Sequence, residues 1–400
     1  MAEAQPDFRS PAFLLDHVRA TMAFYHPRCI DPAGGFYHYF KDDGTVYDSR
    51  SRHLVSSTRF IFNYAMAWRR FGEPQYRDAL WHGLDFLRAA HRDPQTGGYA
   101  WTLLDGLPQD RTHHCYGLAF VLLAYAKAVE AGIDEARLWL DETWALMEAR
   151  FWEPQAGLYA DEATADWTLS GYRGQNANMH ACEALLAAYE ATRESRYLQR
   201  AALLADNMVK RQAAATDGLV WEHYHADWTP DWDYNKGDRS NIFRPWGYQP
   251  GHQTEWAKLL LILDRHQPSD WRLTRARELF DRALDCSWDA THGGMIYGVD
   301  REYRPYDSDK YFWVQAESIA TAALLADRSG DDQYWQWYER LWSYSWTHFV
   351  DHRYGAWFRI LAPDNRRLTD EKSPAGKVDY HTMGACYEVL QVLACSTSRP

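Results

Sequence analysis

Two pairs of residues in this chain have the types and the spacing for proton transfer. His180 is followed by Glu183, and His252 by Glu255, each three positions later. Within a helix this spacing places both side chains on one face. A carboxylate beside an imidazole orients the ring, selects its tautomer and stabilises its charged form, as an acid/base histidine requires. Each pair is therefore a candidate for catalysis, with a local structural ion pair as the alternative interpretation.

Other kinds of chemistry have weaker support in the sequence. Zinc binds His and Glu, but the spacing here is H-x-x-E rather than H-E-x-x-H, and no cysteine cluster accompanies it. Six cysteines are scattered without a C-x-x-C pair, which predicts reduced thiols rather than disulfides. The chain has no G-x-S-x-G, Walker loop or G-x-G-x-x-G motif. We therefore expect acid/base catalysis with no metal and no cofactor.

A repeated phrase indicates which elements position these residues. Turn residues, glycine and then aromatic or β-prone residues recur six times, with marker glycines at Gly35, Gly98, Gly157, Gly218, Gly294 and Gly355. The intervals between the markers are 63, 59, 61, 76 and 61 residues. A supersecondary unit repeated along the chain favours a single domain of residues 1–400. The long fourth interval indicates an insertion.

Pairs of helical segments are predicted around these phrases, from apolar residues at spacings of three and four. The expected ranges are 11–27, 53–71, 75–91, 113–131, 135–151, 176–193, 196–213, 250–266, 270–287, 311–328, 332–348 and 379–395. One member of each pair is apolar almost all round, as in residues 118–128, whereas the other carries a charged face, as in residues 197–212. Six buried helices inside six amphipathic ones form an all-α (α/α)6 barrel, with short β-hairpin-like loops.

The inner helices of such a barrel run in one direction, so their N-termini meet at one end, where we expect the functional site. Histidine occurs at five of these six N-termini. The candidates are Arg52, His53 and Arg59; His113, His114 and Tyr116; Asn176, Asn178, His180 and Glu183; His252 and Glu255; Trp313 and Glu317; and Asp379 and His381. A single histidine on an apolar helix is more often a satisfied core residue, but several at equivalent positions of a repeat favour a site.

Composition narrows the class of ligand. The chain has 20 Trp and 26 Tyr, whose flat faces and polar edges suit sugars, with large core residues as the alternative explanation. The net charge is −12 without a long basic run, so nucleic acid is not an expected partner. No apolar window reaches the roughly 18 residues of a membrane span, and the N-terminus lacks the pattern of a secretory signal. We expect a cytoplasmic enzyme, not bound to a membrane, that is a monomer or a homodimer.

Four blocks of the sequence carry a resemblance to a known family. They are RHLVSSTRFIFNYAMAW (52–68), NANMHACEALLAAYEAT (176–192), GHQTEWAKLLL (251–261) and DYHTMGACYEVL (379–390). Together they resemble the N-acylglucosamine 2-epimerase superfamily, and within it the aldose–ketose isomerases of the D-mannose isomerase type. The resemblance covers essentially the full chain and supports the same barrel. It implies interconversion of a reducing sugar through a cis-enediolate, without a metal or redox cofactor.

The resemblance also implies roles for the candidates. His252 and His381 would be the proton-transfer pair, and His180 would help to open the sugar ring. Arg52 would bind and polarise the C1 and O2 region of the sugar, with Glu255 in the catalytic group. The expected substrate contacts are Asn176, Trp313 and Glu317, together with His113, Tyr116 and Arg59 at the same end of the barrel.

The expected reaction is the interconversion of D-mannose and D-fructose, with D-lyxose and D-xylulose as a second pair. A base poised near neutral pH removes the C2 proton, and donors hold the developing enediolate oxygen. The same intermediate leads to the 2-epimer, so a 2-epimerase of mannose, cellobiose or N-acylglucosamine is the alternative. The lack of a glycine-rich phosphate loop for a nucleotide effector weighs against N-acetylglucosamine. A glycoside hydrolase on this barrel would need two carboxylates about 5–10 Å apart, and a non-catalytic sugar-binding module is the third possibility.

The long fourth interval contains HADWTPDWDYNKGDRSNIFRPWGYQPGH (225–252), which runs directly into His252. A polar, aromatic loop at the functional end would serve as a lid that limits the pocket to a monosaccharide. An ordinary surface insertion and a dimer contact are the alternatives.

Overall fold

The computed structural model describes residues 5–239 and 241–396. These residues form twelve α-helices: α1 (Pro11–Tyr25), α2 (Leu54–Phe71), α3 (Pro74–Phe86), α4 (Cys115–Glu130), α5 (Ala136–Arg150), α6 (Gln175–Thr192), α7 (Ser195–Asp206), α8 (Pro250–His266), α9 (Asp270–Ser287), α10 (Phe312–Ser329), α11 (Asp332–His348) and α12 (Tyr380–Ser396). Helices α3 and α7 continue as π-helical segments, η1 (Leu87–His91) and η2 (Asn207–Gln212). All twelve predicted helices are confirmed, and with the π segments included no bound differs by more than two residues.

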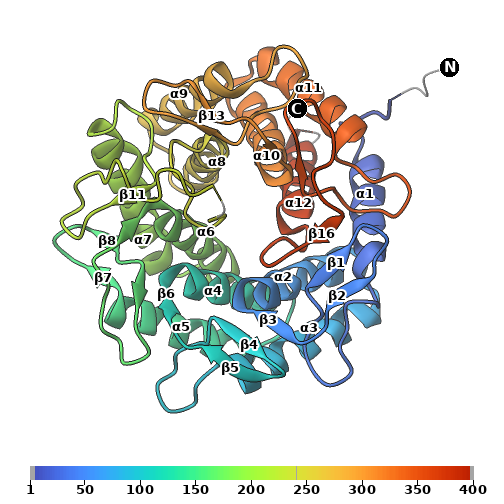
Figure 1. Ribbon diagram of the computed structural model, residues 1–400, viewed down its shortest axis with the longest axis vertical. Coiled ribbons are helices and arrows are strands. Elements are labelled where there is room, and N and C mark those ends of the chain that lie inside the picture. The colour runs from blue at the N-terminus through green and yellow to red at the C-terminus, as the bar shows by residue number, and fades with distance from the viewer. Residues whose placement is uncertain (1–4, 240, 397–400) are drawn as a thin grey trace.

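The even-numbered helices surround a central axis and the odd-numbered helices lie outside them (Figure 1). Each inner helix packs against the inner helix before and after it in the chain, and α12 packs against α2 to close the ring. The fold is therefore the predicted (α/α)6 barrel.

Burial explains which helices are inner. Helix α4 is buried on every face from Gly117 to Ala126. Outer helix α9 instead buries a stripe at spacings of three and four, from Ala276 through Leu279 and Phe280 to Ala283. A helix that is apolar all round has to be enclosed, whereas a stripe needs only one covering surface. Burial of each large apolar side chain contributes about 1.5–3 kcal/mol to this arrangement.

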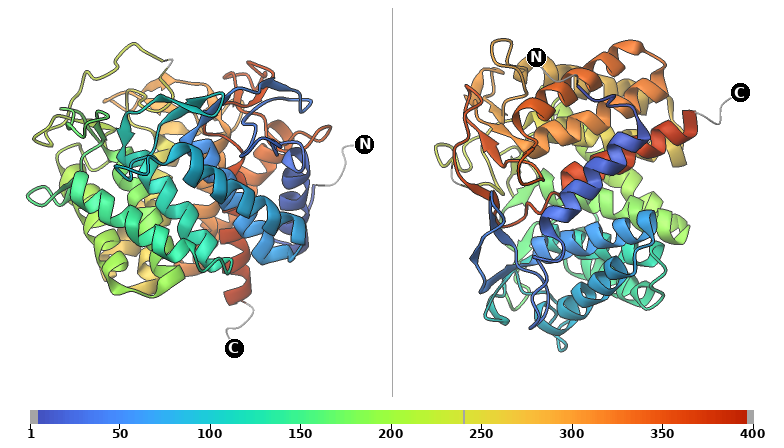
Figure 2. Two further views of the ribbon diagram at one scale, coloured as in Figure 1. Left: turned by 90° about the horizontal axis from the view of Figure 1, so that it is seen from below. Right: turned by 90° about the vertical axis from the view of Figure 1, so that its right-hand side faces the viewer.

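Short strands gather at the end of the barrel where the inner helices begin (Figure 2). They are β1 (Tyr39–Lys41), β2 (Val46–Asp48), β3 (Ser51–His53), β4 (Thr102–Leu104), β5 (Leu107–Asp110), β6 (His113–His114), β7 (Trp152–Glu153), β8 (Leu158–Tyr159), β9 (Glu162–Ala163), β10 (Arg173–Gly174), β11 (His223–Tyr224), β12 (Gly298–Val299), β13 (Pro305–Asp307), β14 (Lys310–Tyr311), β15 (Ile360–Leu361) and β16 (Glu371–Ser373). Their pairings are antiparallel, and β1 with β16 joins the two ends of the chain through Phe40 and Ser373. The loops that contain these strands set the position of the N-terminus of each inner helix.

The glycine phrases form tight turns after the outer helices, as predicted. In the fifth phrase the Asp289 amide donates to the Gly294 carbonyl at 2.9 Å, and Trp288 bridges to Met295. Gly294 has φ of 80°, which L side chains rarely adopt. A Cβ at this position would lie 2.4 Å from Cζ of the buried Tyr344 ring. Glycine is therefore required here for both its backbone conformation and its size.

No helix in the described part of the chain combines the length and the apolarity that crossing a membrane requires.

Gly294→Ala should destabilise the barrel more than Gly330→Ala. Both glycines have positive φ, but a Cβ at Gly330 would meet nothing within 4 Å. Alanine at Gly330 should cost about 1–2 kcal/mol for its backbone conformation, and at Gly294 about 1–3 kcal/mol more for overlap with Tyr344. Urea unfolding of both variants measures the difference; equal losses would show that Tyr344 does not restrict the turn.

Candidate active site

A cavity opens at the N-terminal ends of the inner helices. Its polar lining comes from Arg59, Asn176, His180, His252, Glu255, Arg359, Lys377 and His381, and its aromatic lining from Tyr116, Phe243, Tyr297, Tyr311, Phe312 and Trp313. Each of the six inner helices contributes at least one of these side chains. The predicted end of the barrel is thus the end that holds the cavity.

Most of the predicted site residues meet in this cavity. They are His180, His252, His381, Glu255, Asn176, Trp313, Tyr116 and Arg59. Glu317 lies directly behind the wall, where its carboxylate bonds to His381. Trp313 lies close to two of the histidines, with ring centroids 4.9 Å from His252 and 5.8 Å from His381.

The structure does not bring Arg52 or His113 to the cavity. Arg52 forms an ion pair with Asp31 at 2.5 Å and donates to two backbone carbonyls. His113 stacks on Trp167 with centroids 3.7 Å apart. Both belong to strands, β3 and β6, that end before the helix begins, so a helical extrapolation from the inner N-terminus misplaces them. The arginine from this part of the chain that lines the cavity is Arg59, in α2.

Arg59 reaches the cavity from the second turn of α2. It donates to the carbonyl of Gly376 and lies 3.4 Å from the Tyr116 hydroxyl. Its guanidinium also covers the rings of Phe120 and Tyr380, at 4.4 and 4.7 Å from their centroids. These contacts fix the side chain and leave a buried positive charge beside the cavity.

The partner of His252 differs from the predicted one. Its Nδ1 lies 2.9 Å from Oε1 of Glu222, whereas no hydrogen bond joins it to Glu255 within the described chain. The Gln175 amide nitrogen donates to the other oxygen of Glu222 at 3.0 Å and also lies 2.9 Å from Nδ1 of His252, while its oxygen accepts from Trp256. The i,i+3 interpretation of His252 with Glu255 is therefore wrong. Helical spacing makes a contact possible, but Glu222 approaches from the segment just before β11 and takes the position.

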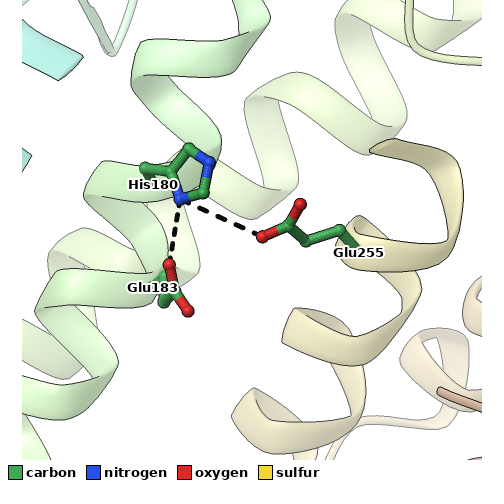
Figure 3. Close-up of side chains that lie close together, drawn as sticks. All are labelled: His180, Glu183 and Glu255. Atoms are coloured by element: carbon green, nitrogen blue, oxygen red, sulfur yellow. Dashed lines mark hydrogen bonds and ion pairs between the residues drawn. The ribbon is translucent and has the colours of Figure 1, made fainter. Parts of the chain in front are cut away.

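The i,i+3 interpretation of His180 with Glu183 is confirmed. Nδ1 of His180 lies 2.9 Å from Oε2 of Glu183, and Glu255 approaches the same nitrogen to 3.9 Å (Figure 3). The other oxygen of Glu183 accepts from the Tyr380 hydroxyl. Burial alone would raise the pKa of Glu183, but His180 and Lys258 lower it well below the usual value.

His381, in α12, is likewise held by a carboxyl group, which comes from the neighbouring inner helix α10. Its Nδ1 lies 2.6 Å from Oε1 of Glu317, whose other oxygen accepts from the Lys258 ammonium at 2.5 Å. Burial alone would lower the pKa of Lys258, but the surrounding carboxyl groups raise it, so this lysine stays charged. Glu317 therefore accepts hydrogen bonds from two sides.

Burial sets the charge state of two of these histidines. It lowers the pKa of His180 and lowers that of His381 well below the usual value, and the positive charge of Arg59 acts in the same direction on both. Both rings are neutral near pH 7. An ionised carboxylate only accepts, so Glu183 places the proton of His180 on Nδ1 and the lone pair on Nε2. Burial raises the pKa of Glu317, but Lys258 opposes this shift, and the carboxylate form that Lys258 favours places the proton of His381 on Nδ1 in the same way. Such rings are bases ready to take a proton.

Glu255 is the exception among the carboxyl groups. Neither of its oxygens has a hydrogen-bond partner within the described residues, although the side chain is 1% exposed. Burial, together with the negative charges of Glu317 and Glu183, raises its pKa well above the usual value. A buried carboxyl group in this state is a neutral acid that offers an O–H to the cavity.

Two groups of side chains have ligand atoms close enough to hold a metal ion. They are His180, Glu183 and Glu255, and Glu255, Glu317 and His381, with atoms within 4.8 Å of one another. Lys258 already supplies a positive charge to Glu317 and lies 3.9 Å from Glu183 and Glu255. A divalent ion would have to share the site with this ammonium, so the set fits a proton-transfer network better than a metal centre.

The segment of the long fourth interval reaches the cavity. Ile242 and Phe243 line it, and Phe243 stacks on His53 with centroids 5.4 Å apart. Arg244 forms an ion pair with Glu162 at 2.6 Å, which holds the segment to β9. This placement is what the lid interpretation requires.

Four functional candidates escaped the prediction from sequence: Glu222, Lys258, Arg359 and Lys377. Glu222 lies in the fourth glycine phrase and therefore looked like a turn residue. Lys258 carried a usable signal, because a lysine three residues after Glu255 in an apolar helix has to be buried with a partner. Arg359 and Lys377 lie outside the inner helices, whereas the predicted site residues were taken from the expected N-termini of these helices.

Comparisons with known proteins agree with this geometry. The sequence profile of the N-acylglucosamine 2-epimerase (GlcNAc 2-epimerase) family matches residues 35–385. The D-mannose isomerase of Marinomonas mediterranea is 55% identical over 390 residues, 97% of this chain and 99% of that protein. A crystal structure of a D-mannose isomerase superposes with a TM-score of 0.95 at 54% identity, covering 97% of this chain and 100% of the other. The cellobiose 2-epimerase of Spirochaeta thermophila shares the fold, with a TM-score of 0.83 at 23% identity and coverage of 98% and 100%. The chain therefore belongs to the N-acylglucosamine 2-epimerase family.

Proposed function

We propose that this chain is an aldose–ketose isomerase that interconverts D-mannose and D-fructose, with D-lyxose and D-xylulose as a second pair. The observation that carries the proposal is the pair of imidazoles, His252 and His381, that both lie beside Trp313 in one cavity and are each bonded at Nδ1 to a carboxylate. The identity of 55% to a D-mannose isomerase over nearly the whole of both chains supports this choice of sugar.

Proton transfer is assigned to the two imidazoles. The Nδ1 contacts leave Nε2 of each ring to face the sugar, and one of the rings removes the C2 proton of the open-chain aldose. Return of that proton to C1 of the enediolate gives the ketose. His180, tied to Glu183 and packed against Tyr116 with centroids 5.2 Å apart, is placed to assist ring opening.

Charge on the enediolate is handled by Arg59 and Glu255. Arg59 takes the role that the sequence assigned to Arg52, because its guanidinium lines the cavity and stabilises the developing oxyanion. The raised pKa of Glu255 favours its protonated form, and we assign to this group the movement of hydrogen between O1 and O2. Asn176 and Trp313 complete the contacts with the sugar.

The lining of the cavity disfavours a glycoside hydrolase. That chemistry needs two carboxyl groups on opposite sides of the scissile bond. Among the described residues, Glu255 is the one carboxyl group that lines the cavity. The described carboxyl groups Glu183, Glu222 and Glu317 do not line the cavity, and each is bonded to a histidine.

We further propose that the barrel is a single catalytic domain with a monosaccharide as its substrate. The ends of the proposed range, residues 1–4 and 397–400, lie outside the described residues. The cytoplasmic location, the monomeric or homodimeric state and the independence of a metal remain predictions from sequence.

Incubation with D-mannose in deuterium oxide, followed by proton and carbon NMR, tests the proposed function. We expect D-fructose as the product, with deuterium at C1 only to the extent that the transferred proton exchanges with solvent. D-glucose without fructose would make the protein a 2-epimerase. Unchanged mannose without exchange at C2 would refute both activities, and release of sugar from a mannose oligosaccharide would identify a hydrolase.

His252→Ala and His381→Ala should each lower kcat by about 10²–10⁴-fold, the usual contribution of a general acid or base. The matched control is His113→Ala, since this histidine stacks on Trp167 outside the cavity. It should keep kcat within about threefold of the wild type. Steady-state kinetics with D-mannose measure kcat, and circular dichroism verifies that each variant is folded. Near-normal turnover in His252→Ala or His381→Ala would show that this histidine does not transfer the proton.

A further inference from the structure

A buried turn connects β16 to the helix that carries His381. Its residues Pro374, Ala375, Gly376 and Lys377 form part of the cavity wall, and α12 begins three residues after Lys377. His381 transfers a proton in the proposed reaction, whereas these four residues take no part in that transfer. Any movement of the turn would move the first helical turn of α12, in which His381 is the second residue.

The backbone of the turn is strained where it enters the helix. Val378 has φ of 35°, in the left-handed region that β-branched side chains avoid, and Asp379 follows it with φ of 49°. Strain of this kind persists only where surrounding contacts enforce it. The amide of Asn63 donates to the Val378 carbonyl at 2.8 Å, and the Gly376 N–H donates to the Ser56 hydroxyl at 2.7 Å. Both contacts come from inner helix α2.

A buried ion pair holds the other side of the turn. The Lys377 ammonium lies 2.5 Å from Oδ2 of Asp379, and these side chains are 2% and 0% exposed. The same oxygen accepts from the Tyr25 hydroxyl of α1 at 2.6 Å, and Oδ1 accepts from the Thr382 hydroxyl at 3.1 Å. Asp379 thus joins the turn, outer helix α1 and the first turn of α12. Without the ammonium it would be a buried carboxylate with neutral partners only, which is unfavourable.

We infer that Lys377 is a positioning residue for His381: through Asp379 it fixes the strained start of α12, and so sets the place of the His381 imidazole against the sugar. The inference rests on the proposed function, in which His381 transfers a proton. Lys377 lines the cavity wall, but its ammonium is paired with Asp379, and we assign its effect on His381 to this pair. Small errors in the placement of a catalytic group lower turnover strongly while leaving binding nearly unchanged.

The positioning role of Lys377 should make kcat depend on pH. Burial lowers the pKa of Lys377 to about 8, although Asp379 opposes the shift. The other titratable groups that face this pair are Tyr25, His17, Asp42 and Lys372. Burial raises the pKa of Tyr25 and lowers that of His17 to about 4, so both stay neutral between pH 7 and 9. As the pH rises through about 8, Lys377 loses its proton, Asp379 loses its ionic partner, and kcat should fall.

The chain offers a matched control for this ion pair. Lys372 is 0% exposed, lies 2.5 Å from Asp351 and donates to the Gly355 carbonyl, and among the described residues no hydrogen bond or ion pair joins this pair to α12. Lys377→Met should lower kcat for D-mannose by about 10- to 100-fold with KM within about twofold. It should also lose the fall in kcat above pH 8. Lys372→Met should keep kcat within about twofold and retain that fall at a higher pH, because the Lys372 charge lowers the pKa of Lys377.

Two results would overturn the inference while the wild type remains an active isomerase. One is an unchanged kcat and alkaline limb in Lys377→Met; the other is an equal loss of kcat in the Lys372→Met control. If Lys377→Met does not fold, Tyr25→Phe replaces it, because this change removes one hydrogen bond to Asp379 and keeps the charges. A several-fold lower kcat at constant KM in Tyr25→Phe then supports the inference, and wild-type kcat contradicts it. A wild type without isomerase activity would instead refute the proposed function itself.

Discussion

One buried ammonium group organises the centre of this barrel. Lys258 is 6% exposed, lies 2.5 Å from Glu317 and 3.9 Å from both Glu183 and Glu255, and each of these carboxyl groups comes from an inner helix. Removing such groups from water is costly, and the cost is offset only where opposite charges meet with good geometry. The four side chains therefore depend on one another. Without Lys258, three carboxyl groups would be buried together with one fewer positive charge than the arrangement requires.

The chemistry of the cavity follows from this buried charge layer, which consists of Lys258, Glu183, Glu255 and Glu317. Lys258 favours the carboxylate form of Glu317 against burial, which raises its pKa, and helps to lower the pKa of Glu183. As carboxylates, both accept from Nδ1 of His381 and His180 and thereby determine which nitrogen faces the sugar. The same negative charges raise the pKa of Glu255, which becomes the acid of the set. Acids and bases are thus separated by their surroundings rather than by residue type. His252 obtains its carboxylate, Glu222, from a loop outside the layer, so the two proton-transfer candidates are held by independent structures.

The sequence predicted the elements well and the contacts between them less well. Helical periodicity predicted all twelve helices because the inner and outer members differ in how much of each surface is buried. The repeat then indicated the end of the barrel where His180, His252 and His381 meet. Spacing along one helix could not reveal that Glu222, thirty positions before His252, would displace Glu255 as its partner. Arg52 and His113 were misplaced because the chain is extended just before each inner helix, and Lys377 was missed because its role depends on a turn that only tertiary structure defines.

The tautomer of His381 is the most direct test of the whole account. Two-dimensional ¹H–¹⁵N NMR of histidine-labelled protein at pH 7.5, with the His381→Ala variant for assignment, distinguishes Nδ1–H, Nε2–H and the doubly protonated ring. We expect a neutral His381 ring with its proton on Nδ1 in the wild type. In Lys258→Met we expect this single state to be lost, since Glu317 then loses its ionic partner. A wild-type His381 that is doubly protonated, or that carries its proton on Nε2, would contradict the claim that the buried charge layer prepares this histidine as a base.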